Sequence, residues 1–429
     1  MDEHTYRVLL GLNPWIRDAS AWPGCAGKYI PTDYIPRSKK INPVEDRVCL
    51  LTGPRQAGKS TLIWKTIQED SKPWMYINCE EQSLKELCSS PALFFQEMEY
   101  LASQARGWFF DEIQHLQEAG LFLKGLADLR TRKAIIATGS SSFHLHARTR
   151  ESLAGRAERH LLLPLSLSEV LPGHVPETVR LMEGKSLWEK LLVWGGYPEV
   201  FRSTERESVL ARLVEAFVLR DASDIYRIRN PEAFRKLLGL AASMSGNLVN
   251  YSNLADPLGV SVNTVSQYLN ILEENHIIRL LPPYIGGKRA EITSRPKIFF
   301  LDNGLRNFLF GGFQSLHNRS DAGAVMENMV FCELSKYMHP ILDGLNFWRS
   351  SSGAEVDFVL QKGQKIIAVE VKSSNIKKPK ISRSLRSFIQ AYRPDQVLVV
   401  NQGLTHSTRV DGVDVSFLVP PEFPLVLSG

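Results

Sequence analysis

Two clusters of residues in this sequence have the types and the spacing that phosphate chemistry needs. The first, Gly53 to Ser60, reads GPRQAGKS and follows an apolar stretch at Val48–Leu51. It fits the pattern GxxxxGK[ST] in the strand–loop–helix context that the pattern requires. Glycines there let successive backbone N–H groups turn towards a phosphate at the start of a helix. The sequence therefore predicts a nucleotide site.

The residues of this loop have separate expected roles. Lys59 would reach the β- and γ-phosphates of ATP, and the Ser60 hydroxyl would bind Mg²⁺. The residues expected to bind the nucleotide are Gly53, Pro54, Arg55, Gln56, Ala57, Gly58, Lys59, Ser60 and Thr61. ATP and Mg²⁺ are thus the predicted cofactors.

Adjacent carboxylates follow a second apolar strand, which reads GWFFDE at 107–112. Asp111 is placed to hold the Mg²⁺ and Glu112 to activate the attacking water. A third apolar run ends at Ser140, whose hydroxyl is expected to contact the γ-phosphate or that water. The alternative for each is an ordinary polar turn. An Asp-Glu pair is the hydrolase arrangement, so it favours ATP hydrolysis over a small-molecule kinase.

The second cluster lies near the C-terminus. Glu327 falls on a predicted helix, and Asp357, Glu370 and Lys372 fall on a predicted hairpin at Ala354–Ser374. Alternation puts Glu370 and Lys372 on one face of a strand. Carboxylates of Glu327, Asp357 and Glu370 would converge on Mg²⁺, with Lys372 stabilising a phosphate under attack. A simple salt bridge is the alternative, and the sequence leaves open whether this domain cuts nucleic acid.

A basic run follows the hairpin. From Lys372 to Arg386 the sequence contains no acidic residue. Its cations are Lys372, Lys377, Lys378, Lys380, Arg383 and Arg386. Such a run predicts contacts with the phosphates of DNA. The net charge of +5 is mild and argues little by itself.

The elements that must position the first cluster alternate between strands and helices. Further apolar strands are expected at Trp74–Glu80 and His160–Val170. Alternation of this kind predicts a parallel sheet with helical crossovers. Prolines at 172 and 176 mark a break after this core. Amphipathic helices are expected between Glu207 and Ser245.

A helix-turn-helix with a wing is predicted at Val249–Tyr284. Ser252 and Ser261 are the expected helix caps, and Gly259 is the expected turn. The apolar residues of the second helix are Val265, Tyr268, Leu269 and Leu272, and a strand follows at Ile277–Leu281. That helix lacks Lys and Arg and ends in Glu273-Glu274, so DNA reading, a lid and a subunit contact all remain open. Lys288 and Arg289 in the wing are expected to touch phosphate.

Taken in order, GPRQAGKS, DEIQ at 111–114, TGSSS at 138–142 and LAGR at 153–156 resemble a bacterial and archaeal branch of the AAA+ superfamily. Members of that branch fuse the ATPase to a winged helix and a C-terminal domain of unknown function. The C-terminal cluster here resembles the PD-(D/E)xK restriction-endonuclease-like fold. The resemblance implies that Arg156 reaches a γ-phosphate in its own or a neighbouring subunit, with Arg148, Arg150 and Arg159 as alternatives.

The expected fold class is α/β, with a P-loop AAA+ core built on a parallel sheet, a helical and winged-helix middle, and a C-terminal α/β restriction-endonuclease-like domain. The boundaries expected are an N-terminal arm at 1–45, the ATPase core at 46–170, a helical linker or lid at 171–245, the winged helix at 246–312 and the nuclease-like domain at 313–429. Within the arm, the stretch Trp22–Lys40 is expected to be extended from its composition.

Together these features predict an ATP-hydrolysing motor or switch that acts on branched or broken DNA as a hexamer or another ring-like homo-oligomer. The alternative is a regulatory ATPase whose winged-helix and nuclease-like domains bind protein partners. Five scattered cysteines, no leader-like start and no long apolar run predict a cytoplasmic protein without a membrane segment.

Overall fold

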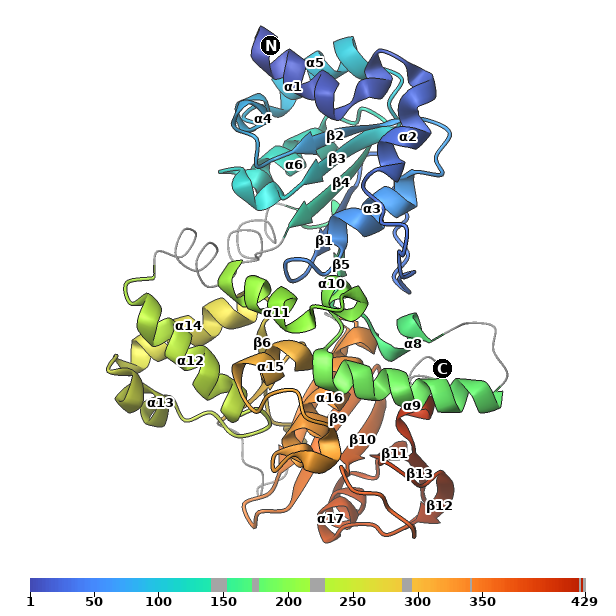
Figure 1. The fold of residues 1–429 in the computed structure, drawn as a ribbon, viewed down its shortest axis with the longest axis vertical. Coiled ribbons are helices and arrows are strands. Elements are labelled where there is room, and N and C mark those ends of the chain that lie inside the picture. The colour runs from blue at the N-terminus through green and yellow to red at the C-terminus, as the bar shows by residue number, and fades with distance from the viewer. Residues whose placement is uncertain are drawn as a thin grey trace. The chain divides into compact units, whose positions relative to one another are not determined.

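The structure is a computed structural model, and the chain forms two compact units, Met1–Leu163 and Pro164–Gly429 (Figure 1). It describes residues 1–139, 153–171, 177–216, 228–287, 295–339, 342–423 and 426. Ser140, Arg148, Arg150, Lys288 and Arg289 lie outside these ranges. The division into five parts stays a prediction.

The N-terminal unit is built on a five-stranded sheet in the order β2-β3-β4-β1-β5, and every neighbouring pair is parallel. Its strands are β1 (Val48–Thr52), β2 (Trp74–Asn78), β3 (Gly107–Asp111), β4 (Ala134–Gly139) and β5 (Ala157–Leu161). Its main helices are α3 (Lys59–Ile67), α4 (Gln82–Leu87), α5 (Pro91–Ala102) and α6 (Ala119–Asp128). β1, β3 and β4 are buried throughout, as expected for strands covered on both faces. The predicted α/β class is confirmed.

Alternation along β3 gives its two faces different partners. The ring of Phe110 meets Phe94 of α5, with 5.3 Å between centroids. The ring of Phe109 points the other way and meets Trp64 of α3 at 5.5 Å. Asp111 is two residues beyond Phe109 and shares its face, which places this carboxylate beside the start of α3.

Residues 3–27 contain four short helices, α1 (Glu3–Leu12), η1 (Pro14–Ile16), η2 (Ala19–Ala21) and α2 (Trp22–Gly27). The last of them, α2, covers the beginning of the stretch Trp22–Lys40 that the composition had suggested to be extended. The Asn13 amide donates to the Tyr76 carbonyl (2.9 Å) and accepts from the Tyr76 N–H (2.8 Å), so it pairs with the open edge of β2. The Trp15 indole donates to the Trp74 carbonyl. These contacts cover the edge strand and explain why the segment folds onto the sheet.

The second unit begins with helices and ends with a sheet. Its helices are α8 (Leu167–Val170), α9 (Glu177–Trp194), α10 (Pro198–Arg202), α11 (Arg206–Glu215), α12 (Pro231–Ser243), α13 (Tyr251–Leu258), α14 (Val262–Glu274), α15 (Asn303–Leu309), α16 (Ala322–Tyr337) and α17 (Arg383–Tyr392). Its strands are β6 (Ile278–Leu281), β7 (Lys297–Phe300), β8 (Asp343–Arg349), β9 (Glu355–Lys362), β10 (Lys365–Val371), β11 (Gln396–Val400), β12 (His406–Val410) and β13 (Val413–Leu418).

Helices α13 and α14 are joined by a tight turn and followed by the antiparallel pair β6–β7. Gly259 makes the turn in the left-handed region (φ 62°), and Ser261 caps α14 by accepting from the Thr264 N–H (3.1 Å). The first cap differs from the expectation, because Asn250 and not Ser252 accepts the free N–H groups of α13. The four apolar positions predicted for α14 are buried. Whether this module acts as a winged helix stays a prediction.

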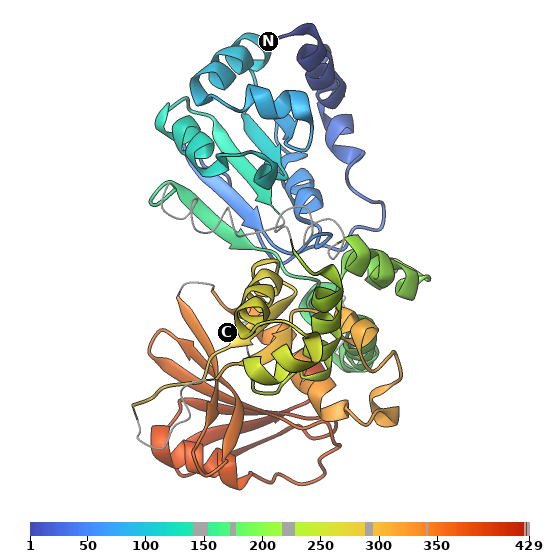
Figure 2. The same ribbon diagram turned by 90° about the vertical axis from the view of Figure 1, so that its left-hand side faces the viewer.

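The C-terminal sheet has six strands in the order β12-β13-β11-β10-β9-β8 and mixes parallel with antiparallel pairs. Helix α17 lies along one face (Figure 2), where Leu385 and Phe388 are fully buried. The β8–β9 register shifts between Trp348↔Val356 and Asn346↔Val359, so β9 carries one extra residue. Such a bulge changes the direction of nearby side chains, and Asp357 sits inside it.

Candidate functional site: the P-loop and the acidic centre

The loop between β1 and α3 has the backbone that a phosphate cradle needs. Gln56 (φ 58°) and Gly58 (φ 90°) both lie in the left-handed region, which lets the chain turn tightly into α3. At Gly53 a close approach leaves no room for a side chain, because a Cβ atom there would lie 2.1 Å from the Leu162 carbonyl oxygen. The loop therefore turns tightly and passes close to the chain after β5, and its role in phosphate binding stays a prediction.

Lys59 is the first residue of α3, and its side chain folds back over the loop. It is 4% exposed, and its ammonium donates to the carbonyls of Gly53 (3.2 Å) and Pro54 (3.0 Å). A buried ammonium held by loop carbonyls is positioned to exchange them for phosphate oxygens.

Arg37 supports the loop from outside and was missed from the sequence. Its guanidinium donates to the carbonyl of Ala57 (2.8 Å) in the loop and to that of Leu163 after β5. It thereby links the loop after β1 to the segment after β5, both at the carboxyl ends of the parallel strands. No local motif marks Arg37, because its partners are backbone carbonyls distant in the chain.

Asp111 is the centre of a network of hydroxyl groups. One carboxylate oxygen accepts from the Ser60 hydroxyl (2.7 Å) and from the Thr138 hydroxyl, and the other accepts from the Tyr76 phenol (3.2 Å). Burial raises the pKa of Asp111, and the Thr138 and Ser60 hydrogen bonds oppose that rise. Oxygen atoms of Ser60 and Asp111 thus lie together, which is the donor set that Mg²⁺ prefers, so the residues present fit the ion.

Glu112 follows directly in a left-handed conformation (φ 54°), which is uncommon for a residue other than glycine. The Thr138 hydroxyl accepts from its backbone N–H (3.2 Å), and the Gln114 amide donates to its carboxylate. Thr138 therefore contacts both acids. A turn of this kind aims the Glu112 carboxylate differently from that of Asp111, and such outliers often mark functional sites.

Thr138 takes the position at the end of β4 where the sequence had pointed to Ser140. Thr138 is completely buried, and Ser140 lies outside the described residues. The signal for Thr138 was present, because it is the polar residue that interrupts the apolar run AIIATG.

Arg156 lies at the amino ends of the parallel strands, whereas the P-loop of the same chain lies at their carboxyl ends. It directly precedes β5, its carbonyl accepts from the Val48 N–H at the start of β1, and its guanidinium pairs with Asp128. The P-loop follows the other end of β1, about 16 Å away along a strand of 5 residues. The arrangement places Arg156 away from the loop of its own chain and favours the neighbouring-subunit role, which stays a prediction.

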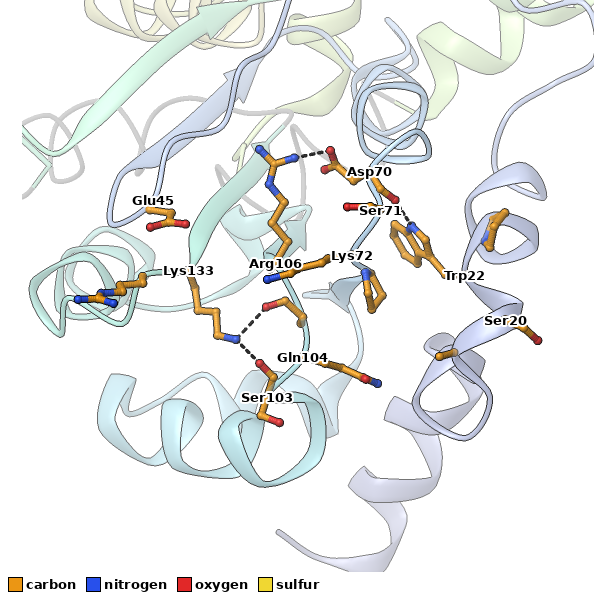
Figure 3. A pocket seen from close by; sticks show the side chains of 15 residues that line it. Ser20, Trp22, Glu45, Asp70, Ser71, Lys72, Ser103, Gln104, Arg106 and Lys133 are labelled. Atoms are coloured by element: carbon orange, nitrogen blue, oxygen red, sulfur yellow. Dashed lines mark hydrogen bonds and ion pairs between the residues drawn. The ribbon is translucent and has the colours of Figure 1, made fainter.

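A pocket of about 680 Å³ also opens at the amino ends of these strands (Figure 3). It is lined by residues that precede β2, β3 and β4, among them Asp70, Arg106 and Lys133. Arg106 pairs with Asp70, and Lys133 donates to the Ala105 carbonyl (2.8 Å). The pocket shares no residue with the predicted nucleotide site, so it is a separate feature of the surface.

The C-terminal cluster forms two neighbouring ion-pair groups instead of one metal site. Glu370 pairs with Lys372 (2.6 Å) and accepts from the Ser382 hydroxyl (2.9 Å). Asp357 accepts from the Val371 N–H (2.6 Å). Glu327 pairs with Lys297 (3.0 Å), a residue of β7 that the sequence did not single out.

Lys297 also pairs with Glu355 of β9 (2.5 Å), so its ammonium lies between two carboxylates. We call Glu327, Glu355 and Asp357 the acidic centre. Although burial acts to lower the pKa of Lys297, the charges of Glu327, Glu355 and Asp357 raise it. Burial and the Glu327 charge raise the pKa of Asp357 to about 8.

The expected convergence of Glu327, Asp357 and Glu370 on Mg²⁺ is not what the structure shows. Within the described ranges, no three His, Cys, Asp or Glu side chains come together in a group that could hold a metal ion. The oxygen atoms of Glu327 and Glu370 already bind ammonium groups. The residues present therefore do not fit a divalent metal ion.

The basic run after β10 is exposed as predicted. Lys377, Lys378, Lys380, Arg383 and Arg386 all face solvent. Ser382 caps α17 by accepting from the Leu385 N–H (3.0 Å). The cap and its bond to Glu370 fix the basic segment next to the Glu370–Lys372 pair.

Three protein families match successive parts of the chain. Residues 45–171 match an AAA domain, residues 185–316 match a domain of unknown function (DUF8612), and residues 322–419 match a domain of unknown function (DUF4143). The N-terminal unit thus contains an AAA-type P-loop domain, as the resemblance implied. The winged-helix and restriction-endonuclease-like assignments stay predictions. None of the helices within the described ranges is long and apolar enough to cross a membrane.

The chain is similar along most of its length to proteins named only as uncharacterized. One from Mycobacterium tuberculosis is 28% identical over 83% of this chain and 76% of its own length. One from Haemophilus influenzae is 24% identical over 87% of this chain and 94% of its own. One from Methanocaldococcus jannaschii is 25% identical over 76% of this chain and 75% of its own length. Bacteria and archaea therefore both contain proteins of this kind.

Two solved structures of the replication initiator DnaA also align. DnaA bound to AMPPCP and single-stranded DNA gives a TM-score of 0.26 at 14% identity, covering 58% of this chain and 92% of DnaA. AMPPCP-bound DnaA from Aquifex aeolicus gives 0.22 at 12% identity, covering 64% and 89%. Scores this low assign no function. What the comparisons support is an AAA domain in the N-terminal unit, followed by two domains whose roles they leave undescribed.

Proposed function

We propose that this protein hydrolyses ATP with Mg²⁺ and uses the cycle to act on DNA as an oligomer. The observation that carries the ATPase part is the meeting of Lys59, Ser60, Asp111 and Glu112 at one edge of the parallel sheet. These residues come from the start of α3 and from the end of β3, and each has a group suited to one part of phosphoryl transfer.

In this proposal, N–H groups of the loop and the Lys59 ammonium hold the phosphates of ATP. Ser60 and Asp111 hold the Mg²⁺, which when bound neutralises charge on the phosphates. Glu112 accepts a proton from water as that water attacks the γ-phosphorus, and ADP leaves. Thr138 keeps the two acids in register through its hydroxyl.

The exposed basic run supports DNA as the partner. Five cations that face solvent on one segment without an acidic neighbour suit a polyanion. The test is the ATP hydrolysis rate alone and with single-stranded, duplex and four-way-junction DNA at two salt concentrations. We expect one form of DNA to raise the rate and higher salt to reverse that rise.

The double variant Lys377→Ala/Lys378→Ala is expected to weaken this DNA effect. The slope of log affinity against log salt should fall by about 2, since each phosphate contact contributes about 0.9. The control, Lys236→Ala/Lys365→Ala, removes two other exposed lysines and should leave the slope unchanged. Equal loss in both doubles would mean that general charge and not this segment attracts DNA.

A second candidate is a regulatory ATPase that binds protein partners. It is favoured by the exposed face of α14, where Asn263, Gln267 and Asn270 are uncharged and the helix ends in Glu273-Glu274. Such a surface is poor for a phosphate backbone. An ATPase rate that no form of DNA changes would move the conclusion to this candidate.

Oligomer formation is tested through Arg156. We expect Arg156→Ala to lower ATP hydrolysis by about 10³-fold, the lower end for an arginine acting on a neighbour's phosphate. Lys59→Ala should be inactive for a different reason. Mixing the two inactive proteins should restore part of the activity, because a mixed interface combines an intact loop with an intact Arg156.

Asp128→Asn is the matched control, since it breaks the Arg156 ion pair and keeps the arginine. It should retain most of the activity. A loss as large as that of Arg156→Ala, with no rescue on mixing, would show that the pair only supports the edge of the sheet.

A further inference from the structure

Lys297 occupies an unusual place for a lysine. It begins β7, and its side chain is 3% exposed. Buried lysines are rare unless paired, and this one pairs with Glu327 of α16 and Glu355 of β9. Its ammonium also lies 5.5 Å from the centre of the Phe347 ring of β8. Side chains from three other elements therefore surround one positive charge.

The Lys297 ammonium occupies the place where the surrounding carboxylates would otherwise bind a cation. The acidic centre places the carboxylates of Glu327 and Glu355 against the Lys297 ammonium, and carboxylate oxygens of this kind usually bind a cation. Here the cation is supplied by the chain itself. A divalent ion at the same point would meet the Lys297 charge at close range, and it would compete for the Glu327 and Glu355 oxygens that Lys297 already uses.

Neighbouring contacts point the same way. Glu355 also lies 3.5 Å from the Arg349 guanidinium, and Glu370 is held by Lys372 and Ser382. The described carboxylates of this region thus have protein partners of opposite charge or hydrogen-bond donors.

We infer that the Lys297 ammonium is the resident cation of the acidic centre, taking the place of a metal ion, and that the C-terminal domain therefore does not cleave DNA. The centre instead joins β7, which follows the helix-turn-helix, to α16 and the C-terminal sheet through ion pairs. This inference is independent of ATP hydrolysis, because none of its residues belongs to the N-terminal unit.

The test compares Mn²⁺ binding by electron paramagnetic resonance in four full-length proteins without nucleotide. Wild type and Asp357→Asn are expected to bind the same amount of Mn²⁺. Lys297→Met is expected to gain one further Mn²⁺ per chain, and Lys297→Met/Asp357→Asn is expected to lose that gain. Wild type is also expected to leave four-way-junction DNA intact in Mg²⁺ or Mn²⁺.

Any of three results would overturn the inference. The first is a Mn²⁺ ion in the wild type that Asp357→Asn removes. The second is wild-type cleavage of DNA that Glu370→Gln abolishes. The third is a folded Lys297→Met protein that gains no ion, since the lysine would then replace nothing. If Lys297→Met does not fold, the Mn²⁺ binding and DNA cleavage of the wild type still test the inference. Lys297→Arg, which keeps the positive charge, is then expected to bind no more Mn²⁺ than the wild type.

Discussion

Replacing Glu112 with glutamine is expected to lower ATP hydrolysis by at least about 10²-fold, the lower bound for loss of a general base. The amide keeps the shape of the side chain and its contact with Gln114 but no longer accepts a proton. ATP binding should change little, because Lys59, Ser60 and Asp111 remain in place. The result would separate binding from chemistry in a single substitution.

Two measurements check this expectation. Binding of a fluorescent ATP analogue gives the affinity, and release of phosphate in a single turnover gives the chemical step. Lys59→Ala should instead lose binding together with hydrolysis, since it removes the ammonium that reaches the phosphates. Glu86→Gln, an exposed position on α4, is the matched control and should behave as wild type.

The left-handed conformation of Glu112 helps to separate loss of the carboxylate from loss of the turn. Glutamine is as able as glutamate to adopt φ 54°, so the turn should survive the substitution. If Glu112→Gln lost nucleotide affinity as well as activity, the carboxylate would be supporting the loop. If hydrolysis were unchanged, another group would be activating the water.

The fold of the predicted nucleotide site could be anticipated because its determinants are consecutive in the chain. A strand, a glycine-containing loop and the start of a helix follow one another at 48–60, and Asp111 ends an apolar strand of its own. Arg37 and Thr138 were not found, since their roles depend on carbonyls and carboxylates that only the folded sheet brings near.

The acidic centre illustrates a different limit. Glu327, Asp357, Glu370 and Lys372 were identified in order, and the strands and helix that carry them formed as expected. Lys297 was overlooked because a lysine at the start of a short strand normally faces solvent. Its burial results from the packing of β7 against α16 and β9, which no periodicity in the sequence expresses.

Replacing Lys297 with methionine is expected to lower the free energy of unfolding of the second unit by about 3 kcal/mol, the low end for breaking a buried ion pair from one side. Methionine fills similar volume but leaves Glu327 and Glu355 without their shared cation. The low end applies because these carboxylates keep some exposure, at 18% and 28%. Lys236→Met, which breaks an exposed pair with Glu232, should change the free energy of unfolding far less.

The measurement is thermal unfolding with and without a non-hydrolysable ATP analogue. The transition that the analogue raises belongs to the ATP-binding unit, because ligand binding stabilises only the unit that binds. The other transition should fall by roughly 2–4 °C per kcal/mol in Lys297→Met. The double variant Lys297→Met/Glu327→Leu should recover much of the loss, since an apolar pair removes the unpaired charge together with its partner. A double variant as unstable as the sum of the two single variants would show that the two residues act separately, and the ion pair would then not be what joins β7 to α16.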